Sequence, residues 1–233
     1  SNPSKDQVAE LRAIEKTRMR VGGVGLRAEV QGLIVRLTSS GVSIQSDDPR
    51  EAQTKVLWDK GLGRELGYDS FEAYLATIPD IPEDLRASSE RFPELVLVDA
   101  RPGLVKTCKL LGVSYSGDDR TFANFDPKKA KVEKVYWIRA QDGRKNSGKI
   151  VSVCRQQFTE DELGLTVIEG LALFAQNPKG LRNRAMDLPG SVGRGGRGYT
   201  TCPCLSWFHR RPELFWSCGE DDDPRYGSAS RRV

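Results

Sequence analysis

The stretch Leu95-Val96-Leu97-Val98 is a run of four apolar residues that ends at Asp99. Two of the four are β-branched, and a run of this length and composition predicts a buried β-strand. After it, a short helix is predicted from Pro102-Gly103 to Gly112, and a second strand is expected over residues 134–139. Strand, helix and strand together indicate one α/β unit in the middle of the chain.

The chain before this unit predicts helices. Ser4 can cap a first helix, and apolar spacing predicts a second over residues 26–37. Asp47 or Asp48 can cap a third helix, and Ser70 a fourth. We therefore divide the chain into a helical section, residues 3–88, and an α+β domain, residues 89–233. One compact unit formed by both is the alternative.

The chain after this unit mixes helix and strand signals. Ile150–Phe158 fits either a strand or a helix. Thr159 is expected to cap a helix start that leads into an apolar helix over residues 165–176. The aromatic-rich runs Thr200–Phe208 and Glu213–Cys218 predict a hairpin. The fold class predicted is α+β: a helical N-terminal section, then a mixed β-sheet with packed helices and a C-terminal β-hairpin.

Composition excludes several classes of protein. The chain has 233 residues, of which 38% are hydrophobic, and it contains four Trp, so a packed core is expected rather than disorder. It lacks the glycine period of collagen and the sustained heptads of a coiled coil. No apolar run reaches the roughly 18 residues that a membrane-spanning helix needs. We therefore expect no membrane partner, with cytoplasmic location as the default.

Positive charge is concentrated in two segments. Residues 127–155 hold nine Lys or Arg against two acids, and residues 179–211 hold seven against one, although the whole chain carries only +4. If the two segments fold onto one face, they would attract a polyanion such as nucleic acid. The alternative is ordinary solvated surface on different faces.

The first basic segment contains a near match to a phosphate-binding loop. Residues 143–149, with Arg144, Lys145 and Lys149, have the spacing G-x-x-x-x-G-K. The next residue should be Ser or Thr to hold Mg²⁺, but it is Ile150, at the start of a stretch that favours extended chain. We interpret the loop as a charged β-turn, with anion contact by its three basic side chains as the alternative.

The second basic segment contains a short Gly-Arg stretch, residues 193–198. Its Arg194 and Arg197 resemble the arginines that contact phosphates in RNA-binding segments, where glycines let the backbone approach closely. The simpler interpretation is a glycine-rich connecting loop, which can also cover a pocket.

Three of the cysteines are candidate ligands of a metal ion. Cys202 and Cys204 are two residues apart and would project from the same side of a strand, with Cys218 on the predicted partner strand. His209, the single histidine, or another cysteine would complete a structural zinc tetrahedron. Inert core thiols are the favoured interpretation, and a redox pair is a third. No cofactor is expected, with structural zinc as the alternative.

One carboxylate stands out from the others. Glu169 interrupts an apolar helix, so we expect it to be partly buried and to need a partner such as Arg139 or Arg155. A structural ion pair is favoured over acid–base catalysis together with Glu162, which lies seven residues earlier.

The sequence resembles no family closely enough to name one. The leading hypothesis is a non-enzymatic binding protein for an anionic partner such as nucleic acid. The second is an enzyme, a hydrolase or transferase, with a pocket covered by residues 191–199 and containing Asp142 and Glu169. The third is a structural or protein-interaction module.

Overall fold

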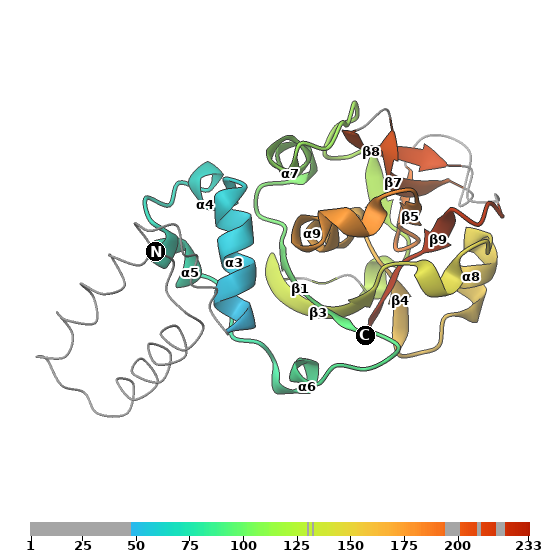
Figure 1. The fold of residues 1–233 in the computed structure, drawn as a ribbon, viewed down its shortest axis with the longest axis horizontal. Coiled ribbons are helices and arrows are strands. Elements are labelled where there is room, and N and C mark those ends of the chain that lie inside the picture. Colours follow the sequence, from blue (N-terminus) through green and yellow to red (C-terminus); the bar gives the residue numbers. More distant parts are fainter. Residues whose placement is uncertain (1–47, 130, 132, 194–200, 209–210, 218–221) are drawn as a thin grey trace, which may run out of the picture. The chain divides into compact units, whose positions relative to one another are not determined.

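The computed structural model describes residues 48–129, 131, 133–193, 201–208, 211–217 and 222–233. The chain divides between Asp47 and Asp48, and Asp48–Val233 forms one compact unit (Figure 1). Its fold is α+β, as the sequence predicts. The two helices predicted before Asp47 lie outside the described residues.

Short elements make up most of this unit. The helices are α3 (Pro49–Asp59), α4 (Leu62–Glu65), α5 (Phe71–Leu75), α6 (Glu83–Arg86), α7 (Leu104–Leu111), α8 (Val151–Gln157) and α9 (Val167–Gln176). The strands are β1 (Glu94–Asp99), β2 (Phe122–Asn124), β3 (Val135–Gln141), β4 (Glu162–Gly164), β5 (Ala185–Asp187), β6 (Ser191–Gly193), β7 (Cys202–Phe208), β8 (Arg211–Ser217), β9 (Tyr226–Ser228) and β10 (Ser230–Arg232). None of the helices in the described ranges has the length and apolar character needed to cross a membrane.

The first sheet has the order β1-β3-β10-β4, and every neighbouring pair is antiparallel. Val96, Leu97 and Val98 of β1 are fully buried, which confirms the buried strand predicted there. β1 and β3 are direct antiparallel neighbours, so the α/β unit is not a parallel crossover. β10 follows all the other strands in the sequence but lies inside the sheet, between β3 and β4.

The second sheet has the order β8-β7-β5-β9. β7 and β8 pair antiparallel over their whole length, which confirms the predicted C-terminal hairpin. β5 pairs antiparallel with β7 and parallel with β9, so this sheet is mixed. A separate two-stranded ribbon joins β2 to β6.

Helix α9 lies near the centre of the unit, where it packs against β1 and also contacts β7 (Figure 1). This position explains why eight of its ten residues are buried. Thr166 caps the helix: its hydroxyl accepts a bond from the Glu169 N–H, and the Glu169 carboxylate accepts one from the Thr166 N–H. This reciprocal pair is a capping box.

In the segment before α9, one expectation was wrong and one open choice is decided. The pattern T-x-x-E occurs at Thr159–Glu162 and again at Thr166–Glu169, and only the second starts a helix. Glu162 instead begins β4, because β10 supplies a pairing partner there. Of the two structures left open for Ile150–Phe158, the helix forms: Ile150 is still extended, but α8 begins at Val151 and buries Val151 and Cys154, one helical turn apart, so tertiary packing overrides the β propensity of the start of this stretch.

The N-terminal helices follow their predicted caps. Asp48 accepts a bond from the Arg50 N–H at the start of α3, and Ser70 accepts one from the Ala73 N–H at the start of α5. Helix α3 also closes the outer edge of β1, because the side-chain amide of Gln53 donates to the Leu95 carbonyl (2.6 Å) and accepts from the Leu97 N–H (2.7 Å). Gln53 thus takes the place of a further strand.

Candidate functional site

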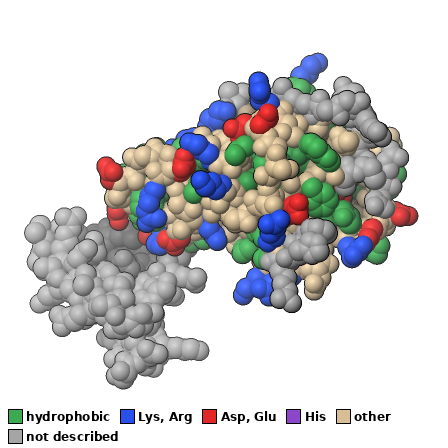
Figure 2. Space-filling model, turned by 90° about the horizontal axis from the view of Figure 1, so that it is seen from above, with side chains coloured by type: hydrophobic (Ala, Val, Ile, Leu, Met, Phe, Trp, Pro, Cys, Tyr) green, Lys and Arg blue, Asp and Glu red, His purple; other side chains and the backbone are tan. Residues whose placement is uncertain are grey.

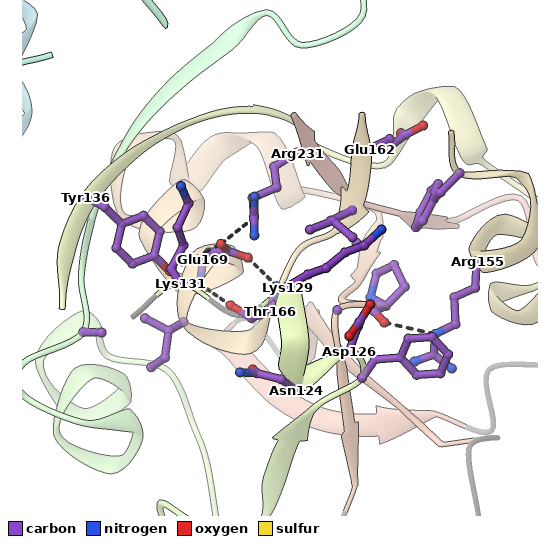
Figure 3. Close-up of a pocket in the computed structure, with 18 of the residues that line it drawn as sticks. Asn124, Asp126, Lys129, Lys131, Tyr136, Arg155, Glu162, Thr166, Glu169 and Arg231 are labelled. Atoms are coloured by element: carbon purple, nitrogen blue, oxygen red, sulfur yellow. Dashed lines mark hydrogen bonds and ion pairs between the residues drawn. The ribbon is translucent and has the colours of Figure 1, made fainter. Parts of the chain in front are cut away.

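A cavity of about 420 Å³ opens between the first sheet, the start of α9 and the connection from β2 to β3 (Figure 3). Its volume lies in the range of about 300–1,000 Å³ that is typical of small-molecule sites. Both apolar and charged side chains line it. They come from Ala100, from the end of β2, the β2–β3 connection and β3 (Asn124, Phe125, Asp126, Lys129, Lys131, Glu133, Lys134, Tyr136), from α8 and the residues after it (Arg155, Phe158, Thr159, Glu160), from β4, Thr166 and α9 (Glu162, Leu163, Gly164, Thr166, Ile168, Glu169), and from Pro189, Gly190 and Arg231.

Glu169 and Arg231 form a buried ion pair in the wall of this cavity. Arg231 Nε lies 2.7 Å from Glu169 Oε1, and the two side chains are only 4% and 1% exposed. Tyr136 donates its hydroxyl to the same oxygen at 3.3 Å, while Oε2 accepts the Thr166 N–H at 2.8 Å. The buried acid therefore has a partner, as predicted, but the partner is Arg231.

The two arginines predicted as partners of Glu169 donate their hydrogen bonds to backbone carbonyls elsewhere. Arg139 donates to the backbone carbonyls of Leu85, Arg86 and Pro93, and so fixes the chain around α6 against β3. Arg155 donates to the carbonyls of Pro189 and Ser191, and its guanidinium lies 4.2 Å from the centre of the Phe125 ring. Periodicity could not distinguish these three arginines, because each partner is set by the sheet order.

Glu162 is the second carboxylate of the cavity that is held by hydrogen bonds. One of its oxygens accepts from Arg91 Nη2, and the other accepts from the Ser230 hydroxyl. Burial, together with the nearby Glu169 charge, raises the pKa of Tyr136 well above its usual range, so this phenol stays protonated. The polar groups in this wall are thus fixed in place as donors or acceptors.

The backbone makes a close approach behind the cavity. Gly164 of β4 and Gly190 pass so near each other that a Cβ atom built on Gly190 would lie 2.2 Å from the Gly164 carbonyl oxygen. A Cβ on Gly164 would likewise lie 2.5 Å from the Gly190 nitrogen. Only glycine fits at these two positions, and the contact holds β4 beside the turn that leads into β6.

Three lysines line the side of the cavity formed by the β2–β3 connection. Within the described part of the chain, Lys129, Lys131 and Lys134 form no ion pair with a carboxylate, unlike Arg91, Arg101, Arg184 and Arg231. Three further acids also line the cavity: Asp126, Glu133 and Glu160. In Figure 3, Lys129 lies between the group of Tyr136, Glu169 and Arg231 and the group of Asp126 and Arg155.

The near match to a phosphate loop forms a closed turn. The backbone N–H groups of Gly143, Arg144 and residues 146–149 all donate to oxygens of the chain itself. Gly143 adopts a left-handed φ of 91°, which the turn requires. These N–H groups are already engaged and cannot also cradle a phosphate, which agrees with the interpretation as a turn.

The basic side chains of that turn point to local partners. Arg144 pairs with Asp142 at 3.2 Å, and Lys145 donates to the Glu90 carbonyl. Arg184, from the second basic segment, reaches the same Asp142 carboxylate at 3.2 Å. Lys149 shows no such bond to a described residue. Asp142 therefore lies in an ion-pair cluster and does not line the 420 Å³ cavity, whereas Glu169 does.

The two basic segments meet at two places, through Asp142 and through the bonds from Arg155 to Pro189 and Ser191. Figure 2 shows that Lys and Arg side chains on the face drawn there alternate with Asp and Glu side chains. Arg194 and Arg197 lie outside the described residues. The described arginines of the first segment mostly hold the chain together, whereas its lysines at the cavity form no ion pair with a described carboxylate.

The predicted metal site is described only in part. Cys202 and Cys204 lie on β7 and are fully buried, and burial raises the pKa of both thiols. Cys218 and His209 lie outside the described residues. Across the residues with described positions, no three His, Cys, Asp or Glu side chains are arranged to hold a metal ion. The zinc site with Cys218 stays a prediction.

Comparison with protein-family models, with curated proteins and with solved structures found no match for this chain.

Proposed function

We propose that this protein is a non-enzymatic binding protein whose anionic ligand enters the 420 Å³ cavity. The observation that carries the proposal is the set of Lys129, Lys131 and Lys134, which line this cavity and form no ion pair within the described chain. Cationic groups that converge on a concave site raise the local concentration of anions. The Glu169–Arg231 pair is neutral and Arg91 offsets Glu162, but Asp126, Glu133 and Glu160 also line the cavity. The proposal therefore rests on where the three ammonium groups lie and not on the net charge of the lining.

The groups in the wall favour binding over catalysis. The described side chains that line the cavity include no Ser, Cys or His, and the hydroxyls of Thr159 and Thr166 are engaged with Asp161 and with the Glu169 N–H. Glu162 and Glu169 each accept hydrogen bonds on both oxygens, so neither is placed to move a proton to or from a ligand. These groups are suited to orienting a ligand by charge and shape.

The cavity size limits what can enter. A volume of about 420 Å³ takes a small molecule, or a single unit of a polymer such as one nucleotide of a nucleic acid, but not a duplex. A polyanion would therefore bind here through an end or an unpaired unit. The place where the two basic segments meet, at Arg155, borders the same cavity.

Adjacent lysines provide a matched test. Lys128 and Lys129 carry the same charge on the same exposed turn, but only Lys129 lines the cavity. Calorimetric titration with inorganic phosphate and with a short single-stranded oligonucleotide should show binding that weakens between 50 and 200 mM salt. Lys129→Gln should weaken it about tenfold, as expected for loss of a charged hydrogen bond, and Lys128→Gln much less.

The two variants separate a local contact from general charge. Equal losses for Lys128→Gln and Lys129→Gln would mean that the anion responds to overall charge rather than to the cavity. Absence of binding by either probe at both salt concentrations would refute the proposed function.

A further inference from the structure

The cavity has two chemically different ends. At one end lie the side chains that surround the Glu169–Arg231 pair, and at the other lie Asp126 and Arg155 (Figure 3). The Phe125 ring packs against Arg155 at this second end. Lys129 lies between the two ends in this view. A ligand that fills the cavity therefore meets a flat, partly apolar surface on one side and cationic side chains beside it.

The flat end is built from an aromatic ring and a guanidinium plane. Arg155 lies 4.2 Å from the centre of the Phe125 ring, and its bonds to two backbone carbonyls hold the guanidinium in place. Phe125 nevertheless keeps 37% of its surface exposed, which is unusual for a large apolar side chain beside a cavity. Phe158 lines the same cavity. Such surfaces favour a planar ring.

The rim of this end offers hydrogen-bond acceptors for the edge of such a ring. Asn124 and Asp126 flank Phe125 in the sequence, and both line the cavity. A carboxylate and a side-chain amide can accept bonds from ring or exocyclic N–H groups, and the amide can also donate one. Asp126 thus has a use that a simple anion site would not give it.

The cationic side suits a phosphate better than a carboxylate. Lysine ammonium groups are compact point charges, and several of them on one segment match a group that carries nearly two negative charges. A single carboxylate is recognised best by the planar fork of an arginine, and Arg231 already directs its Nε toward Glu169.

Resting on the proposed function, we infer that the ligand is a phosphorylated compound with a planar nitrogen heterocycle, of the nucleoside monophosphate type. The ring packs against Phe125, its edge meets Asn124 and Asp126, and the phosphate lies against Lys129, Lys131 and Lys134. The source of this chemistry is either a free nucleotide or the phosphorylated end of a single-stranded nucleic acid.

Three probes distinguish this inference from the proposed function. Adenosine 5′-monophosphate carries the ring and the phosphate, ribose 5-phosphate lacks the ring, and adenosine lacks the phosphate. Calorimetric titration of the full chain should give an affinity for the monophosphate at least about tenfold above that for either fragment, given what stacking on an aromatic side chain contributes. Equal affinity for ribose 5-phosphate and the monophosphate would overturn the inference and leave the proposed function standing.

Two aromatic variants provide the controls. Phe125→Leu keeps apolar volume but removes the flat face, so it should lower affinity for the monophosphate about tenfold and leave that for ribose 5-phosphate unchanged. Trp216→Leu changes an aromatic residue that is 58% exposed but lies outside the cavity, and it should change neither. An unchanged monophosphate affinity in Phe125→Leu would overturn the inference.

A competition experiment distinguishes the two sources of the ligand, a free nucleotide and the end of a nucleic acid. A 5′-phosphorylated single-stranded oligonucleotide that displaces the monophosphate at lower concentration than free nucleotide does would identify a nucleic-acid end as the source. The reverse order would identify a free nucleotide, and both orders support the inference. If none of the phosphorylated probes binds, the inference and the proposed function both fail.

Discussion

Removing the buried guanidinium of Arg231 is the sharpest test of how the cavity wall is held. In Arg231→Met, Glu169 would keep its Thr166 N–H donor at 2.8 Å and its Tyr136 donor at 3.3 Å, but would lose the cation at 2.7 Å. The carboxylate is only 1% exposed, so water cannot readily replace that partner.

The expected loss follows from these contacts. Removing one partner of a buried ion pair typically costs about 3–5 kcal/mol of stability. Because Glu169 keeps two other donors, we expect Arg231→Met to lie at the lower end of this range, at about 3 kcal/mol. For a chain of this size each kcal/mol lowers the melting temperature by roughly 2–4 °C, so a drop of about 6–12 °C is expected. Glu169→Gln should cost a similar amount, because its single amide oxygen can face either the Thr166 N–H or Arg231 but not both, and the buried guanidinium loses its counter-ion.

Thermal and urea unfolding of both single variants and the double variant would measure this. The double variant should lose about 1–2 kcal/mol less than the sum of the single variants, because the two groups contact each other. Arg232→Met is the matched control, since its side chain is exposed and donates to the Asp84 carbonyl at 3.1 Å, and it should cost under about 0.5 kcal/mol. Equal losses for Arg231→Met and Arg232→Met would refute the reasoning.

Three other predictions concern stability. Burial, and to a smaller extent the Asp119 charge, raises the pKa of the Cys108 thiol from 9.0 to about 12. The folded protein therefore loses stability as the pH rises from 9 toward 12, because the thiol ionises more easily in the unfolded chain. Between pH 8 and pH 10 the free energy of unfolding, measured by urea titration, should fall by about 1.4 kcal/mol less in Cys108→Ala than in the unchanged protein. An identical loss in both proteins would contradict this. Gln53→Leu leaves two backbone groups of β1 without their partner and should cost about 1–3 kcal/mol by urea unfolding, whereas no change would mean that water replaces the amide. Gly190→Ala must push the backbone away from Gly164 and should cost about 2 kcal/mol or more, with a lower melting temperature; a neutral result would show that the close approach can relax.

Local signals predicted much of the fold. Asp48 and Ser70 cap α3 and α5 as expected, and Gly112 ends α7 in a left-handed conformation with φ of 69°. Such caps are read from a few neighbouring residues, so the sequence is enough to find them. The apolar run of β1 and the aromatic runs of the hairpin are long enough to be recognised for the same reason.

The three-residue strands could not be predicted in the same way. β4 and β10 are too short for a periodic pattern, and each is defined by its partner strand rather than by its own sequence. Thr159–Glu162 even carries a capping pattern that the pairing with β10 overrides. Local propensity and tertiary pairing compete there, and pairing decides the outcome.

In the candidate site, too, local sequence predicts some residues, while others depend on how distant parts of the chain come together. Glu169 could be identified because a carboxylate within an apolar helix needs a partner, but Arg231 could not, because it lies on β10 far along the chain. Lys129 was counted in the first basic segment, yet nothing in the sequence distinguishes it from Lys128. Only the course of the chain between β2 and β3 brings one of them to the cavity.

The position of β10 has a consequence for biosynthesis. Ser230 bonds to Gln141, 89 positions earlier, and the same strand supplies the neighbour of β4. Until residues 230–232 leave the ribosome, β3 and β4 have no common neighbour, and the site that needs Arg231 cannot exist. β3 and β4 must therefore stay unjoined during translation until β10 pairs with both, and chaperones have most reason to hold the chain in that interval.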